Sequence, residues 1–129
     1  MLAGIVSLEQ GGDAALFEEA VETVCLSLAR QMAADGEGAS KLLEVRLTGA
    51  ANEIEARQAA RTVVASTLVK CAMYGNDPNW GRIMCALGYA GVKLEEPLVD
   101  ISVNGHKLVS HGLGTGFDAA AASQAMRAD

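Results

Sequence analysis

One carboxylate stands between two glycines, in the sequence Asp-Gly-Glu-Gly at 35–38, and that setting suits ligand binding. The glycines allow a sharp turn and leave room for a ligand against the backbone. A carboxylate at Glu37 could hold a substrate ammonium group by a charge-assisted hydrogen bond. From spacing alone, however, a solvated Glu in a Gly-rich helix stop is the favoured interpretation, because most exposed acidic side chains bind only water.

A second polar stretch, Gly-Asn-Asp-Pro-Asn at 75–79, precedes the only tryptophan of the chain, Trp80. Asp77 suits a helix N-cap, and the proline after it suits the first helical position. We expect Asn79 to serve local structure, although it could face a ligand. We expect Trp80 to be a packing anchor and Arg82 to be solvated or ion-paired.

Other catalytic or metal-binding arrangements find little support. His106 and His111 are five residues apart, which on a strand places them on opposite faces and argues against a shared metal ion. No serine or threonine lies in a nucleophile-elbow sequence, and the loop at 36–41 lacks phosphate-loop spacing. The residues alone therefore indicate an enzyme subunit or a small-molecule-binding domain, with no metal site and no named reaction.

The elements around these residues follow from hydrophobic spacing. Apolar residues from Leu16 to Met32 recur at three- and four-residue steps, which predicts an amphipathic helix, capped by Asp13 and ending near residues 35–36. Alternation over 43–48 predicts a half-buried strand. Asn52, with Glu three residues later, predicts the start of a helix that ends near residue 65.

The second half of the sequence predicts a strand over 68–74 and a helix that begins at Pro78 and stops at Gly91. Gly75, between them, gives the backbone the freedom to turn. Asn-Gly at 104–105, between apolar runs at 99–103 and 106–110, predicts a hairpin. A last helix is expected after Phe117. Two β-α-β crossovers would be right-handed if their strands are parallel neighbours.

Composition indicates one globular domain over 1–129, of the α/β (α+β) class, with mixed sheets packed against Ala-rich helices. The net charge of −6 argues against nucleic-acid binding. No apolar run is long enough for a bilayer, and residues 1–8 suggest a truncated strand. Three cysteines, with no C-x-x-C pair, predict buried free thiols in a reducing compartment, at Cys25, Cys71 and Cys85.

Several sequence blocks resemble, in the same order, the β chain of the glutamate N-acetyltransferase (ornithine acetyltransferase) family of arginine biosynthesis. The blocks lie at 17–32, 35–50, 66–91, 99–105 and 117–118. The resemblance implies a layered α-β-β-α sandwich and a cytoplasmic enzyme that moves acetyl from N-acetylornithine to glutamate, releasing ornithine. Some members also use acetyl-CoA as donor, and no other cofactor is implied.

The same resemblance implies a precursor that cleaves itself before a threonine, which becomes the nucleophile at the start of the β chain. An oxyanion hole and a substrate-binding lysine belong to the family's α chain. The family's Asp-Gly-Glu-Gly loop supplies a substrate-binding glutamate, which maps onto Glu37 and reverses the interpretation from spacing alone.

Two departures from the family pattern point to a fragment of a β chain. No Ala-Thr cleavage site is present, so the nucleophile is expected outside these 129 residues, and the family's C-terminal tail is missing after Asp129. We expect the fragment alone to be inactive and to associate with the missing α chain, with the remaining β-chain segments or with itself, as an oligomer. The alternatives are a non-catalytic small-molecule-binding regulatory domain and an inert interaction domain.

Overall fold

The computed structural model describes residues 11–127, and its contacts divide the chain into two units, one ending at Leu42 and one beginning at Leu43. The first unit contains α1 (Gly11–Ala34), which confirms the long helix. Asp13 lies inside α1 and is therefore not its N-cap. The strand expected at 1–8 lies outside the described residues.

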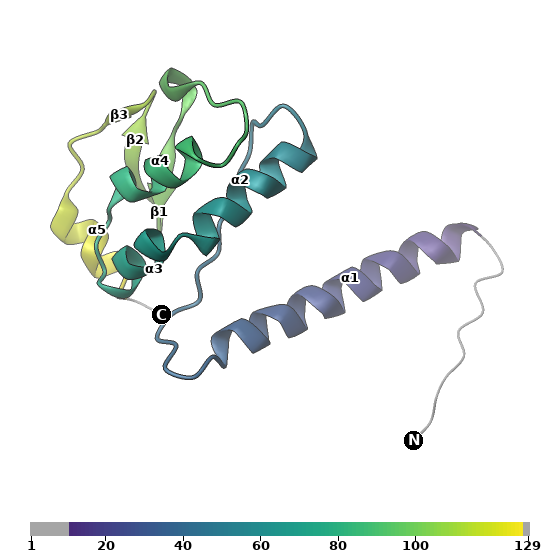
Figure 1. Ribbon diagram of the computed structural model, residues 1–129. Helices are drawn as coiled ribbons and strands as arrows, with labels where there is room; N and C mark the ends of the chain where they lie inside the picture. The colour runs from purple at the N-terminus through teal and green to yellow at the C-terminus, as the bar shows by residue number, and fades with distance from the viewer. Residues whose placement is uncertain (1–10, 128–129) are drawn as a thin grey trace. The chain divides into compact units, whose positions relative to one another are not determined.

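The second unit joins four α-helices to a small sheet (Figure 1). Its elements are α2 (Glu53–Ala65), α3 (Thr67–Tyr74), α4 (Trp80–Gly88), the 3₁₀ helix η1 (Glu96–Leu98), β1 (Ile101–Val103), β2 (His106–Ser110), β3 (Leu113–Gly114) and α5 (Ala119–Ala125). The described strands are antiparallel in the order β1-β2-β3. Helices packed on a sheet confirm the α/β (α+β) class, but consecutive antiparallel strands exclude the expected β-α-β crossovers from the described sheet.

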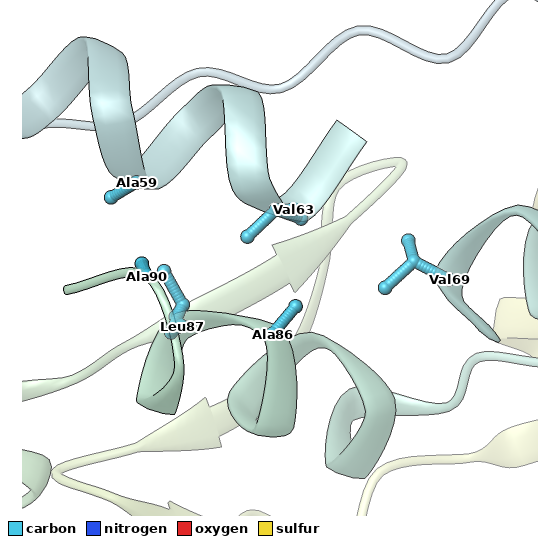
Figure 2. Packing of buried hydrophobic residues seen from close by; sticks show 6 residues of the cluster. All are labelled: Ala59, Val63, Val69, Ala86, Leu87 and Ala90. Atoms are coloured by element: carbon cyan, nitrogen blue, oxygen red, sulfur yellow. The ribbon is translucent and has the colours of Figure 1, made fainter. Parts of the chain in front are cut away.

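Small side chains hold α2, α3 and α4 together. The cluster consists of Ala59, Val63, Val69, Ala86, Leu87 and Ala90. Figure 2 shows Ala59 and Val63 of α2 directed toward the residues at the C-terminal end of α4. Gln58 reinforces this contact, because its Nε2 donates to the carbonyl of Ala90 at 2.7 Å.

A second cluster packs the hairpin against α5 and α4. Its buried members are Ile101, Leu108, Val109 and Ala122, and its partly buried members include Trp80, Ile83 and Met84. Ile83 packs against both clusters, so α4 connects the helical layer to the sheet. The position of α4 is thereby fixed from two sides.

Local capping and turn signals are confirmed where they were strongest. Asn52 Oδ1 accepts a hydrogen bond from the Glu55 amide at 2.9 Å, and Asn52 Nδ2 donates to Glu55 Oε1 at 3.1 Å. In the hairpin, Asn104 and Gly105 have φ values of 44° and 82°, the left-handed pair that a type I′ turn requires. The helix expected after Phe117 is also present as α5, and its cap, Asp118, which was not predicted, accepts from the amide of Ala120 at 2.9 Å.

The strand predicted over 68–74 is wrong, because these residues belong to helix α3. Ser66 caps α3, and Val69 and Ala72 are buried with a helical spacing of three. A short apolar run fits both the helical period of 3.6 residues and the strand period of two, so its pattern alone does not select one. Packing against the rest of the fold favours the helix.

Residues 43–48 were predicted to form a strand, but they pair with no strand of the described sheet. The alternation is present, since Leu43, Val45 and Leu47 are half-buried against the helical cluster while the residues between them are exposed. The segment is nevertheless outside the described sheet, which contains only β1, β2 and β3. A strand requires a neighbour as well as a pattern.

Two further expectations are corrected by the structure. All three cysteines are exposed free thiols. Helices α3 and α4 turn other positions inward, such as Val69 and Ala86, and residues 15–34 of α1 are all exposed. Helix α4 ends at Gly88, before the expected stop, and Gly91 lies in the following turn with φ of 71°.

No helix within residues 11–127 has the length and apolar character needed to cross a membrane.

Candidate functional site

Glu37 lies at the tip of a tight turn directly after α1. The Ala39 amide donates to the Gly36 carbonyl at 2.8 Å, which closes a four-residue turn with Glu37 and Gly38 at its centre. Gly38 has φ of 72°, as position i+2 of a type II turn requires. Glu37 is exposed, so the turn presents its carboxylate to solvent.

The polar stretch at 75–79 first ends α3. The Asp77 amide donates to the Ala72 carbonyl at 2.9 Å and the Asn76 amide to the Met73 carbonyl at 3.2 Å. These two bonds form a Schellman motif, in which the left-handed residue is Asn76 with φ of 54°. Gly75, from which the sequence predicted this freedom, has an ordinary φ of −78°.

The same stretch then begins α4, with Asn79 as its N-cap. Asn79 Oδ1 accepts from the Arg82 amide at 3.2 Å, and Asn79 Nδ2 donates to Asp77 Oδ2 at 2.9 Å. The predicted N-cap at Asp77 is therefore wrong by two residues, because the proline precedes the helix. The structural role expected for Asn79 is confirmed.

Two large side chains of α4 hold neighbouring elements. Trp80 lies against the backbone of β3, since a β-carbon added at Gly114 would be 3.3 Å from Trp80 Cζ2. Arg82 Nη1 donates to the Leu68 carbonyl in the first turn of α3 at 3.3 Å, an exposed hydrogen bond to backbone that the sequence did not predict. Their described contacts explain Trp80 and Arg82 as structural residues.

A polar cluster that the sequence did not indicate lies at the open end of the hairpin. Asp100 Oδ1 accepts from the His111 amide and Asp100 Oδ2 pairs with Lys107 Nζ, both at 2.9 Å. Both contacts stabilise the charged carboxylate, the Lys107 hydrogen bond most, so the pKa of Asp100 lies below its ordinary value. Asp100 and Lys107 are seven residues apart, and only the hairpin register reveals the pairing.

This cluster does not form a catalytic triad. Ser110 Oγ lies 3.1 Å from His111 Nδ1, but Asp100 contacts the His111 backbone amide and not the ring. A triad requires the carboxylate on the second ring nitrogen. His111 follows β2 with φ of 51°, whereas His106 lies within β2, so the two are not a strand pair. Residues 11–127 contain no group of three or more potential metal ligands.

The candidates therefore fall into two sets. Glu37 lies in the first unit, and its described surroundings are those of its own turn. The stretch at 75–82 and the hairpin cluster lie in the second unit, where their polar atoms bind backbone or one another. Glu37 is the site candidate whose side chain has no structural role in its turn.

Known proteins resemble this chain along its whole length. The sequence profile of the ArgJ family matches residues 1–129. The "Arginine biosynthesis bifunctional protein ArgJ" of Thermus thermophilus is 52% identical over 113 residues, 88% of this chain and 29% of that protein. The protein of the same name from Thermosynechococcus vestitus is 47% identical over 114 residues, 88% of this chain and 27% of that protein.

The chloroplastic protein of that name from Oryza sativa subsp. indica is 41% identical over 128 residues, 98% of this chain and 28% of that protein. This chain thus spans less than a third of the length of these curated relatives. The crystal structure of the protein from Bacillus halodurans superposes with a TM-score of 0.89 at 42% identity, covering 96% of this chain and 58% of that chain. Profile, sequences and fold agree, and the chain belongs to the ArgJ family.

Proposed function

We propose that this chain is part of a self-cleaving N-terminal-threonine acyltransferase that moves acetyl from N-acetylornithine to glutamate in arginine biosynthesis. The observation that carries the proposal is the family match over all 129 residues. The named relatives are described as bifunctional proteins of arginine biosynthesis. We further propose a cytoplasmic location, and acetyl-CoA as a second acetyl donor.

In the proposed reaction, the threonine hydroxyl oxygen attacks the acetyl carbonyl of N-acetylornithine. The hydroxyl proton passes to the leaving nitrogen, and the C–N bond breaks to release ornithine. The amine of glutamate then attacks the acetyl-enzyme, and the threonine regains its proton. We place the threonine outside these 129 residues, on the remaining part of the protein. The isolated chain should therefore transfer no acetyl group.

We assign to Glu37 the binding of the substrate ammonium group. The turn supports this role, because it holds the carboxylate at its tip, and the described contacts leave the side chain exposed. A charged hydrogen bond of this kind contributes about 1.5–3 kcal/mol. No metal ion or further cofactor enters the proposal, and residues 1–129 are proposed to form one domain, the core of the β chain.

Complementation tests the function. The chain is co-expressed with the parts of the Thermus thermophilus relative that lie outside the matched region, and acetyl transfer from N-acetylornithine to glutamate is measured. Activity that requires both polypeptides supports the proposal. Saturable amino-acid binding by the chain alone, without acetyl transfer in the complex, would favour a non-catalytic binding domain instead.

Glu37→Gln tests the site within the active complex. The glutamate KM should rise about 10- to 150-fold, because the charged hydrogen bond is lost while the side chain keeps its shape. The matched control is Glu22→Gln, which removes an exposed carboxylate from α1. Equal KM values for the two variants would remove Glu37 from the site.

A further inference from the structure

Glu37 is flanked by two glycines, and the structure separates their roles. Gly38 has φ of 72°, in the left-handed region, whereas Gly36 has no positive φ. A β-carbon at Gly36 would make ordinary contacts, 3.4 Å from the Ala39 β-carbon and 3.6 Å from the Ala33 carbonyl oxygen. Of the two glycines, therefore, only Gly38 has a backbone that other residues rarely adopt.

The left-handed backbone of Gly38 sets the type of the turn that carries Glu37. The turn is of type II, closed by the Ala39 amide, which donates to the Gly36 carbonyl at 2.8 Å. The commoner type I turn needs a negative φ at its third position, and it would change ψ at Glu37 by roughly 150°, from about 120° to about −30°. The backbone at Glu37 therefore depends on residue 38 remaining left-handed.

The turn is also tied closely to the end of α1. The Asp35 amide donates to the Gln31 carbonyl at 2.9 Å, so the last helical turn is complete just before Gly36. Glu37 lies three residues beyond Ala34, the last residue of α1. The C-terminal end of a helix carries partial negative charge, which favours a cation near the Glu37 carboxylate. Helix and turn together thus place the carboxylate where an ammonium group is favoured.

We propose that Gly38 is a positioning residue for the substrate ammonium group, because its left-handed backbone holds Glu37 where the carboxylate can bind that group. The proposal rests on the role proposed for Glu37 and adds the residue through which the backbone enforces it. A β-carbon at Gly38 would have no neighbouring atom within 4 Å. Glycine is therefore needed at this position for its conformation and not for space.

Kinetics of Gly38→Ala test the proposal in the active complex with the complementing parts of the Thermus thermophilus relative. The glutamate KM should rise about 5- to 30-fold, because a left-handed alanine lowers the population of the binding-competent turn by that factor. The kcat should stay close to that of the unchanged complex, because saturating glutamate selects the competent turn. A lower kcat with an unchanged KM would indicate general damage and overturn the proposal.

Gly49 offers a matched control away from the turn. It has φ of 78°, and a β-carbon there would also have no neighbour within 4 Å, so alanine introduces the same backbone strain as at Gly38. Gly49 belongs to the second unit, before Asn52, the cap of α2. Gly49→Ala should therefore leave the glutamate KM unchanged. Equal KM values for the two alanine variants would overturn the positioning role.

Gly38→Asn distinguishes conformation from crowding. Asparagine adopts the left-handed region more readily than alanine, and this chain already places Asn76 and Asn104 there, with φ of 54° and 44°. Gly38→Asn should therefore recover most of the affinity that Gly38→Ala loses, although asparagine is the larger residue. A higher KM for the asparagine variant than for the alanine variant would assign the effect to crowding of the ligand and overturn the proposal.

The double variant Glu37→Gln with Gly38→Ala tests whether Gly38 acts through the carboxylate. Glu37→Gln already removes the charged hydrogen bond, so Gly38→Ala should add little to its KM, and fully multiplied effects would overturn the proposal. An unchanged KM for Glu37→Gln alone, or a complex without acetyl transfer, would refute the proposed site or function and this inference with it. A raised KM for Glu37→Gln with no effect of Gly38→Ala would refute this inference alone.

Discussion

Replacing Gly112 by Ala should destabilise the second unit much more than the same change at Gly105. Both glycines have left-handed backbones, with φ of 77° and 82°. They differ in the space around them, since a β-carbon at Gly112 would lie 2.5 Å from the Glu96 carbonyl oxygen, whereas one at Gly105 would have no neighbour within 4 Å. The atom at Gly112 therefore collides with backbone, which cannot move aside as a flexible side chain can.

The two costs are separable in size. A left-handed alanine costs about 1–2 kcal/mol, which is the whole effect expected at Gly105. At Gly112 the collision adds about 1–3 kcal/mol of overpacking, giving a loss of about 2–5 kcal/mol in total. The Gly112 amide also donates to the Val99 carbonyl at 2.8 Å, so a shift of the turn threatens that hydrogen bond. Any gain from a stiffer unfolded chain is the same in both variants and cancels.

Urea unfolding followed by Trp80 fluorescence measures both losses. Trp80 is the only tryptophan, and it packs against Gly114, two residues from the substituted position. The fluorescence therefore reports on the unit that contains the change. Free energies of unfolding that agree within about 0.5 kcal/mol for the two variants would refute the argument from backbone collision.

Asn79→Ala should lower the free energy of unfolding by about 1 kcal/mol, because α4 loses the oxygen that accepts from the Arg82 amide. Thermal melting of Asn79→Ala beside Asn79→Asp, which keeps an accepting oxygen, checks this; equal losses would contradict it. Asp100→Asn should reduce the loss of stability in acid. The pKa of Asp100 is lowered in the folded chain, chiefly by Lys107, so its contribution is complete above about pH 4 and disappears as the pH falls through the lowered pKa. The urea midpoint should therefore fall less steeply between about pH 7 and pH 2 for the variant than for the unchanged chain. Equal slopes for the two proteins in acid would count against the pairing of Asp100 with Lys107.

Features set by neighbouring residues could be predicted from the sequence. The helix cap at Asn52 depends on a hydrogen bond to Glu55, three residues later, and the hairpin turn depends on the positive φ values of Asn104 and Gly105. Both predictions are confirmed. The turn around Glu37 belongs to this group, because the glycine after it supplies the left-handed residue. Whether Glu37 binds substrate stays a prediction, since that role depends on a ligand.

Features set by distant residues could not be predicted. The run at 67–74 satisfies both helical and strand periods, and the burial of Val69 in the helical cluster, with Ala72 buried three residues later, fits the helix. The segment at 43–48 needed a neighbouring strand that its own pattern cannot supply. Asp100 was missed because its partners, Lys107 and His111, approach only after the hairpin has formed.

The small side chains at the centre of the second unit affect how its stability depends on temperature. Among its described buried residues, alanine recurs on every α-helix, at Ala59, Ala72, Ala86 and Ala122, and Ala90 follows α4. An alanine methyl hides little apolar surface, and the heat-capacity change of unfolding grows with the apolar surface exposed. The curve of stability against temperature should therefore be broad and shallow, so cooling weakens this fold less than it weakens one built around leucine and phenylalanine.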